Sequence, residues 1–207
     1  MMAMDDPATA LARLIGNRVR DARLDHHWTL DQLAEAAAVS RRAVVNVEQG
    51  SANPSIATLL RLADALGIGL PALVEAPSQA PLTVVGAGEG AVLWSGAAGG
   101  RGVLVAGTTP PDVVELWDWT LGPGDRHRTE PHAAGTRELM QVLEGQVHLE
   151  VGDQVITLGR GDAASFHGDV PHGYGNPGDD PARFVLAVHE PGVGATRPAA
   201  LDGRRRD

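Results

Sequence analysis

Residues 29–50 have the sequence TLDQLAEAAAVSRRAVVNVEQG, and this stretch decides the fold of the N-terminal part of the chain. Thr29, with Gln32 three residues later, forms a capping-box pattern, which is typical of the first turn of a helix. Ser40 is suited to cap a second helix, and Gly50 is suited to end it. Only two residues separate the two predicted helices. That link is too short for the reversal of a helical bundle, so the sequence predicts a steep helix crossing.

The side chains of these two helices divide into a buried and an exposed set. Ala34 is small enough to lie where the helices meet, and Val44 and Val47 would anchor the second helix. The predicted outward face carries Ser40, Arg41, Arg42, Val45 and Asn46. Arg pairs with guanine and Asn with adenine in the major groove, while a helix N-terminus can hold a phosphate. These residues are the predicted contacts to double-stranded DNA. The alternative is the solvated surface of a generic helical bundle, and the spacing as a whole favours DNA binding.

Two different compositions follow one another along the chain. Only 4 of the 26 glycines and 3 of the 14 prolines precede residue 75. The first part predicts five helices, at about residues 8–25, 29–37, 40–49, 55–66 and 71–75. Short alternating apolar runs in the second part predict strands at 113–121, 138–144, 146–151, 154–158, 163–166, 170–175 and 183–190, with extra strands within 82–106. We therefore expect a helical domain at 8–75, a linker at 76–81 and a β domain at 82–192.

The composition also excludes several classes of protein. The 207 residues contain no cysteine, which excludes disulfides, thiol catalysis and thiolate metal sites. No apolar run is long enough to span a membrane and the acidic start is not a secretory signal, so we expect a cytoplasmic protein without a membrane partner. The formal charge of −9 argues against nucleic acid in general. However, residues 1–75 hold 7 Arg and 9 acidic residues, whereas residues 76–207 hold 10 Arg and 17 acidic residues, so most of the negative charge lies outside the helical part.

Residues 11–74 resemble the Xre-type, lambda-repressor-like helix-turn-helix domain. The matching stretches are WTLDQLA at 28–34, VSRR at 39–42, VEQG at 47–50 and NPSIATL at 53–59. The resemblance implies a five-helix DNA-binding domain with an ion pair between Arg23 and Glu48 that braces the first helix against the recognition helix. Ala38 departs from the family, which usually has a glycine at this turn. An alanine in the left-handed region costs roughly 1 kcal/mol.

Two spaced groups of residues mark the second part of the chain. The first group is Pro123-Gly124, Glu130-Pro131-His132, Glu138 and Leu143-Glu144-Gly145, and the second is Gly161-Asp162, Pro171-His172 and Asn176. Glu138 alternates with Met140 and Val142 and is expected to point inward with them. These spacings resemble the two cupin motifs, over roughly residues 110–190. The resemblance implies an α+β, multi-domain fold in which the five-helix domain precedes an all-β cupin barrel, a double-stranded β-helix or jelly roll.

In metal-binding cupins, a His-x-His pair, a glutamate and a later histidine hold one metal ion. The resemblance assigns these positions to Glu130, His132, Glu138 and His172, with Glu130 in place of the first histidine and five residues between His132 and Glu138, where three or four are usual. Two imidazoles with one or two carboxylates suit one divalent metal, Zn, Fe or Mn. A metal-free pocket for an anionic or zwitterionic ligand stays open as an alternative, as do core polar residues that satisfy one another. His127 is expected in a loop, as a reserve candidate.

The order of an Xre domain and a cupin resembles a large family of bacterial regulators. It implies a homodimeric transcriptional regulator, not an enzyme, whose cupin senses a small-molecule effector and thereby modulates binding to a pseudo-palindromic operator. One alternative is a cupin-type non-haem metal-dependent enzyme, an oxygenase or epoxidase, that uses His132, Glu138 and His172 and carries the helical domain. Another is an interaction module whose barrel only dimerises the DNA-binding part.

Overall fold

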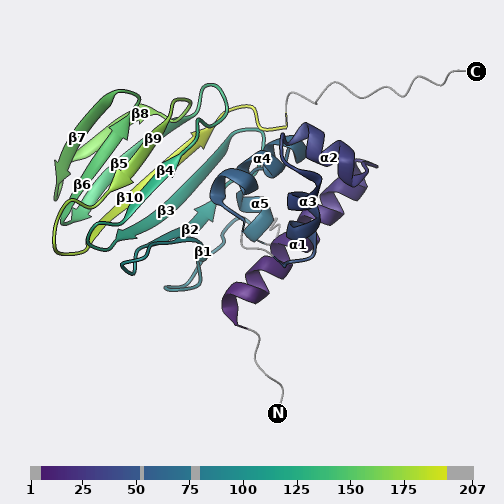
Figure 1. The fold of residues 1–207 in the computed structure, drawn as a ribbon, viewed down its shortest axis with the longest axis horizontal. Helices are drawn as coiled ribbons and strands as arrows, with labels where there is room; N and C mark the ends of the chain where they lie inside the picture. The colour runs from purple at the N-terminus through teal and green to yellow at the C-terminus, as the bar shows by residue number, and fades with distance from the viewer. Residues whose placement is uncertain (1–5, 52–53, 76–79, 195–207) are drawn as a thin grey trace, which may run out of the picture.

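The computed structural model describes residues 6–51, 54–75 and 80–194, in which five helices are followed by ten strands (Figure 1). This order confirms the α+β fold class expected from the sequence. Most of the linker predicted at 76–81 lies outside the described residues, which resume at Ala80. Within the described ranges, no helix combines the length and the apolar character that a membrane span requires.

Capping side chains define where the helices begin. The helices are α1 (Pro7–Asp25), α2 (Leu30–Ala36), α3 (Arg41–Glu48), α4 (Ile56–Leu66) and α5 (Pro71–Val74). The Thr29 hydroxyl accepts a hydrogen bond from the Gln32 amide, and the Gln32 side chain accepts one from the Thr29 amide. The predicted capping box is therefore present. Ser40 and Ser55 cap α3 and α4, each accepting a hydrogen bond from the backbone N–H three residues later.

The first three helices pack together around the predicted apolar anchors. Ala34 of α2 and Val44 and Val47 of α3 are buried. Arg23 of α1 makes a bidentate ion pair with Glu48, with Nε 2.6 Å from Oε1 and Nη2 2.9 Å from Oε2. Both side chains are at most 10% exposed, so water screens this pair far less than a surface ion pair. The pair fixes α3 against α1, as the resemblance implied.

Two antiparallel sheets form the β domain. The larger sheet has the strand order β1 (Ala91–Ser95), β2 (Arg101–Gly107), β3 (Val113–Leu121), β10 (Ala182–Glu190), β5 (Arg137–Glu144) and β8 (Ala163–His167). The smaller sheet has the order β4 (Arg126–Thr129), β9 (His172–Gly175), β6 (Gln146–Val151) and β7 (Gln154–Gly159). Strand β4, with the sequence RHRT, was not predicted, because it is short and contains no apolar residue.

The core of the barrel follows from strict alternation along its longest strands. Strands β3 and β10 pair over nine residues, and every second residue of each is buried. Trp117 and Trp119 of β3 point inward, and the Trp119 indole stacks on Phe184 of β10 with ring centroids 5.9 Å apart. The barrel interior therefore has a dense aromatic layer at its centre.

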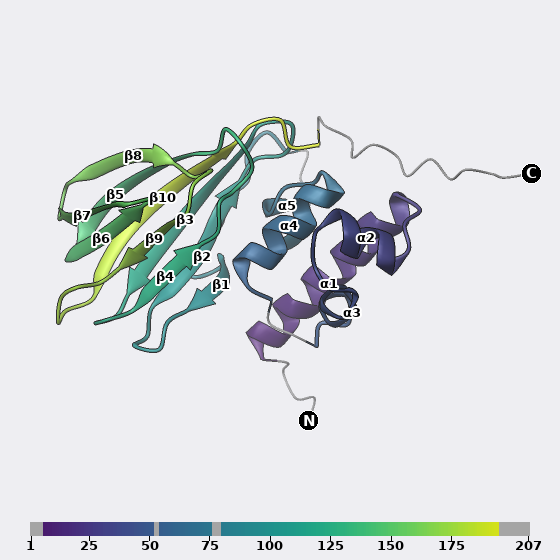
Figure 2. The ribbon, with the colours of Figure 1, turned by 45° about the horizontal axis from the view of Figure 1, so that its top comes forward.

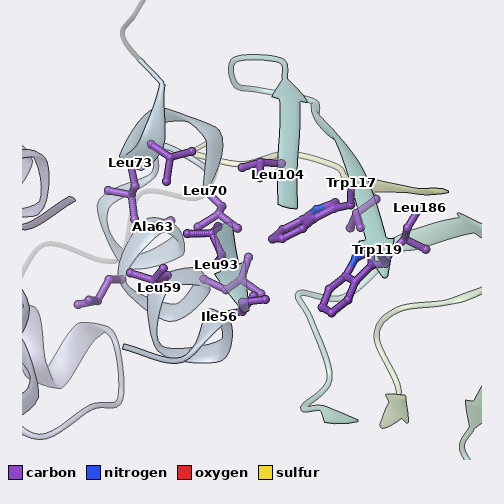
Figure 3. Close-up of a cluster of buried hydrophobic side chains, with 14 of the residues drawn as sticks. Ile56, Leu59, Ala63, Leu70, Leu73, Leu93, Leu104, Trp117, Trp119 and Leu186 are labelled. Carbon is purple, nitrogen blue, oxygen red and sulfur yellow. The ribbon is translucent and has the colours of Figure 1, made fainter. Parts of the chain in front are cut away.

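Helix α4 joins the two domains. In both views α4 and α5 lie between the barrel and α3 (Figures 1 and 2). Ile56 of α4 and Leu93 of β1 lie between this helix and the two indoles of β3 (Figure 3). Ile56 and Leu60 line the same cavity as Trp117 and Trp119. One face of α4 thus closes one end of the barrel, and the recognition helix α3 lies on the far side.

The left-handed turn between α2 and α3 gives a test of the local fold. Ala38 has φ +50°, a region that disfavours residues with a Cβ. We expect Ala38→Gly to raise the free energy of unfolding by about 1 kcal/mol, measured by denaturant titration with circular dichroism. Ala10→Gly, at an exposed position inside α1, is the matched control and should lower the free energy of unfolding by about 0.5–1 kcal/mol. Equal destabilisation by both substitutions would contradict the assigned turn.

Candidate functional site

Three polar side chains from distant parts of the chain meet inside the barrel. Glu138 lies in β5, His172 begins β9, and His132 lies between β4 and β5. Glu138 Oε1 is 3.2 Å from His132 Nε2 and 3.0 Å from His172 Nε2. One ligand atom of each residue lies within 4.8 Å of the other two. The structure therefore brings together three of the four residues that the cupin resemblance indicated.

Hydrogen bonds orient two of these groups so that one atom of each stays available. The Tyr174 hydroxyl donates to Glu138 Oε2 at 2.6 Å, and His172 Nδ1 lies 2.8 Å from the Val170 carbonyl oxygen. The carbonyl requires a proton on Nδ1, so Nε2 presents its lone pair in the neutral ring. Among the described residues, Glu138 Oε1 and His172 Nε2 are buried and have no aligned hydrogen-bond partner, despite their short separation. Buried donor atoms left open in this way fit a divalent metal.

The charges in this group favour a bound cation. Burial raises the pKa of Glu138, but the adjacent His132 and His172 lower it more strongly. The resulting pKa of Glu138 is about 2. The carboxylate is therefore ionised at neutral pH even though its side chain is fully buried. Burial lowers the pKa of His172 and the nearby carboxylate raises it, with a net rise above the ordinary value. A metal ion would take the place of the proton that favours His172 beside the Glu138 carboxylate.

The structure does not bring Glu130 into the group. Glu130 directly follows β4, in which exposed arginines alternate with half-buried residues. By the period of two it continues the exposed side of the strand. Its side chain borders a small pocket of about 40 Å³ that His132 also lines. The structure therefore brings together three of the four predicted residues and leaves Glu130 at the rim of the group.

The expectation that His127 lies in a loop is wrong. His127 belongs to β4 and faces the cavity, with its ring centroid 4.8 Å from that of Trp119. Burial, together with the neighbouring His172, lowers the pKa of His127 to about 4, so the ring is neutral at physiological pH. Its alternation with Thr129, another inward residue of β4, was the sequence signal that pointed to this orientation.

Two further buried carboxyl groups were missed by the sequence analysis. Glu115 of β3 and Glu190 of β10 are each 2% exposed. The Trp117 indole N–H donates to Glu115 Oε2 at 2.8 Å. Burial, reinforced by the charge of Glu190, raises the pKa of Glu115 to about 8, and burial raises that of Glu190 to about 7. Glu115 alternates with Trp117 and Trp119, so its inward direction was available from the strand period.

The predicted DNA-contact residues lie together at the start of α3. The exposed residues are Ser40, Arg41 and Arg42, and the half-exposed ones are Val45 and Asn46. Arg41 Nε lies 3.2 Å from Asp31 Oδ1, and both side chains are more than half exposed. Such a surface pair contributes little stability, so Arg41 can exchange this partner for a phosphate or a base. In Figure 2, α3 lies on the side of α4 that faces away from the barrel.

Comparison with known families assigns both halves of the chain. The helix-turn-helix family matches residues 19–73, and the cupin domain family matches residues 117–189. The first match lies within the helical part, and the second contains the His132, Glu138 and His172 group. The chain joins an Xre-like helix-turn-helix domain to a cupin domain. Its helix-turn-helix domain carries the exposed face of α3, and its cupin domain carries the candidate metal centre.

Named transcriptional regulators align along most of the chain. The HTH-type transcriptional regulator SutR of Escherichia coli is 26% identical over 184 residues, covering 87% of this chain and 97% of the relative. The HTH-type transcriptional regulator PuuR of Escherichia coli is 23% identical, covering 85% and 94%. The solved structure of a helix-turn-helix family transcriptional regulator from Vibrio cholerae has a TM-score of 0.68 at 24% identity, covering 89% and 99%. This likeness confirms the fold over the part of the chain that the alignment covers.

The raised pKa of Glu115 predicts a specific pH dependence of stability. An unfolded Glu ionises near pH 4.5, whereas folded Glu115 ionises at about 8, so its contribution to stability falls as the pH rises between these values. Glu115→Gln keeps an acceptor for Trp117 and removes the charge. We expect the variant to gain several degrees in melting temperature relative to the parent at pH 8, but not at pH 5. Glu144→Gln, on the exposed side of β5, is the control, and a pH-independent difference for Glu115→Gln would contradict the assignment.

Proposed function

We propose that this chain is a sequence-specific DNA-binding transcriptional regulator of the cytoplasm, with its helix-turn-helix domain at about residues 8–75 and a sensing cupin domain at about 82–192. The observation that carries the proposal is the exposed start of α3, which presents two arginines and an asparagine on a helix braced by the Arg23–Glu48 pair. Recognition helices of this motif place such N-terminal residues in the major groove.

The α3 face has the chemistry that base reading needs. Arg42 can donate two hydrogen bonds to one guanine, and Asn46 can pair with adenine. Ser40 and the first amides of α3 are suited to hold a phosphate, and Val45 offers an apolar surface to a thymine methyl. The overall negative charge does not oppose this, because most of it belongs to the barrel rather than to the helical domain.

The relatives support the regulatory proposal over most of the chain. SutR and PuuR are both named HTH-type transcriptional regulators, and each aligns over more than nine-tenths of its own length. Both domains are included in these alignments, so the likeness is not limited to the DNA-binding part. We extend the regulatory role to this chain on that basis.

The cupin domain is proposed to sense its effector through a metal. His132 Nε2, Glu138 Oε1 and His172 Nε2 would hold one Zn, Fe or Mn ion, which two imidazoles and a carboxylate suit. When bound, the metal would supply a Lewis-acidic centre that takes a donor atom of the effector. Tyr174 holds the Glu138 carboxylate and the Val170 carbonyl holds the His172 ring, so this chain fixes the donor atoms in place before a ligand arrives.

Regulation is proposed to act through a homodimer. Two helix-turn-helix domains read half-sites one helical turn apart only when their separation matches the DNA. An effector that binds one arrangement of the cupin more tightly shifts the population of dimers that fit an operator. No enzymatic step is required for this function.

A cupin metalloenzyme is the second candidate, and one observation favours it. Two histidines and one glutamate form the donor set that non-haem iron enzymes use to leave positions for substrate and oxygen. Turnover of an organic substrate by iron-loaded protein would favour the enzymatic function over the regulatory one. Metal binding without turnover, combined with operator binding, would put the regulator first.

Removal of the base-reading side chains should abolish selective DNA binding. We expect Arg42→Ala and Asn46→Ala each to weaken binding to a selected duplex about tenfold or more, and to reduce its preference over random duplex. Fluorescence anisotropy at several salt concentrations measures both effects. Arg160→Ala, which removes the same charge from an exposed position on the barrel, should leave the affinity unchanged. Salt-independent binding, or an equal loss of duplex affinity in Arg160→Ala and Arg42→Ala, would contradict the proposed role of these residues in DNA binding.

Metal content tests the barrel centre directly. Protein purified without chelator should contain close to one divalent metal ion per chain by elemental analysis, and His132→Ala/His172→Ala should contain almost none. His148→Ala/His189→Ala removes two imidazoles outside this group and serves as the matched control. Equal metal content in the two double variants would refute the proposed centre and leave a metal-free pocket.

A further inference from the structure

The outer face of the six-stranded sheet carries an exposed apolar surface. In both views the helices lie beside β1 and β2, and the strands β10 and β5 run clear of them (Figures 1 and 2). Leu116 of β3 is 45% exposed on this face and Leu139 of β5 is 58% exposed. Val114 of β3 is 40% exposed on the same side. Large apolar side chains that gather on one face of a sheet are typical of a protein interface.

One row of side chains crosses the middle of this face, with small and large residues in alternation. The row runs over four neighbouring strands, β2, β3, β10 and β5, and its members in that order are Ala106, Leu116, Ala187 and Leu139. Both alanines are half-exposed and both leucines are exposed. A leucine side chain is longer than an alanine methyl group, so the surface alternates in height along the row.

The row is complementary to itself in shape. The midline of the six-stranded sheet lies between β3 and β10. A twofold axis along this midline lays β3 of one copy over the partner's β10, and β2 over the partner's β5. Leu116 then faces the partner's Ala187, and Leu139 faces the partner's Ala106. Sheets that pack face to face lie about 10 Å apart and interdigitate their side chains, so each leucine has an alanine to pack against.

An ion pair on the same face is complementary to itself in charge. Arg183 of β10 contacts Asp118 of β3, with Nε 3.0 Å from Oδ1 and Nη2 2.7 Å from Oδ2. The two residues lie on opposite sides of the midline, so the same axis brings Arg183 over the partner's Asp118. Within the described ranges, Arg183 Nη1 makes no hydrogen bond, and each carboxylate oxygen accepts more than one. Two copies would therefore share a network of four alternating charges.

The face is large enough for a stable dimer. Strands β3 and β10 have nine residues each and extend about 30 Å, and six strands spaced about 4.8 Å apart extend roughly 29 Å. A standard interface buries about 800 Å² on each partner, which is close to the area of this face. Its centre is apolar and its charged residues lie toward the ends of the strands, as in the core and rim of such interfaces.

We propose that the outer face of the six-stranded sheet binds a second copy of this chain, with the twofold axis along the midline between β3 and β10. The inference rests on the proposed regulatory function and names the surface through which its homodimer forms. The occupant is a second copy because both the leucine–alanine row and the Asp118–Arg183 pair complement themselves. The interface belongs to the cupin domain alone, so the exposed start of α3 stays available for DNA.

The test is sedimentation equilibrium of the full chain and of two charge-reversal variants, Asp118→Arg and Arg183→Asp. We expect a dimer for the parent, and dimerisation about a hundredfold weaker for each variant alone, because like charges then face each other across the axis. An equal mixture of the two variants should recover the dimer, since one copy carries two arginines and the other two aspartates. An ion pair that acts only within one chain predicts no recovery. Val155→Asp, at an exposed position on the smaller sheet, is the control and should remain dimeric.

Leu116→Asp tests the apolar row and should dissociate the dimer while the circular dichroism spectrum stays unchanged. It also takes the place of the charge-reversal variants if these fail to fold. A monomeric parent, no recovery in the mixture, or equal dissociation of Val155→Asp and Leu116→Asp would overturn the inference.

Duplex binding is measured on the same preparations, so that the two proposals fail separately. Selective duplex binding by the parent, together with an intact dimer in Leu116→Asp, overturns this inference alone. Dissociation of the dimer in Leu116→Asp, without selective duplex binding by the parent, overturns the proposed regulatory function and leaves the interface in place.

Discussion

The apolar contact between α4 and the open end of the barrel is the interaction on which the arrangement of the molecule depends. Leu59, Leu62 and Leu66 of α4 are buried in the helical core, while Ile56 and Leu60 face the barrel. A helix buried on two sides removes apolar surface from water in both domains at once. The same contact closes the barrel interior and fixes the side of the helical domain that carries α3. Structure at the sensing end and structure at the DNA-binding end therefore share one helix.

In the barrel interior, the neighbouring groups decide whether a buried carboxyl group is ionised. Glu138 is fully buried and ionised, because two imidazoles lie within 3.2 Å of its oxygen. Glu115 is as deeply buried, yet its nearest charges include other carboxyl groups, and its pKa rises instead. Desolvation raises both pKa values; the hydrogen bonds and charges of the two histidines outweigh it at Glu138, whereas the charge of Glu190 adds to it at Glu115. The interior thus combines a site for a divalent metal with carboxyl oxygens that lack donors.

The proposed regulator and the alternative metalloenzyme would use the same metal-binding residues, so the barrel alone does not distinguish the two functions. The difference lies in the helical domain, where Arg42 and Asn46 occupy the exposed start of a well-braced helix. An enzyme has no need of a base-reading face, whereas a regulator has no need of turnover. The alignment with SutR and PuuR over both domains also supports the regulatory function. In the proposed regulator, the His132, Glu138 and His172 group serves to capture a ligand.

The sequence by itself determined the helix starts and the inward face of the long strands, which depend on neighbours along the chain. Helix starts at Thr29, Ser40 and Ser55 follow from local capping, and the strand β3 follows from a period of two. The inward direction of Glu138 followed from the same period. These predictions succeeded because a cap or a strand face is set by residues a few positions apart.

Only the tertiary structure decided what depends on segments far apart in the chain. It placed Glu130 at the rim and His127 inside, because the short polar segment Arg126–Thr129 is a strand only through its pairing with β9. It also brought Asp64 of α4 beside Glu190 of β10. No local pattern encodes that meeting, since it results from the docking of two domains. Burial and charge at such a seam are properties of the assembled chain, and they exist only once both domains are packed together.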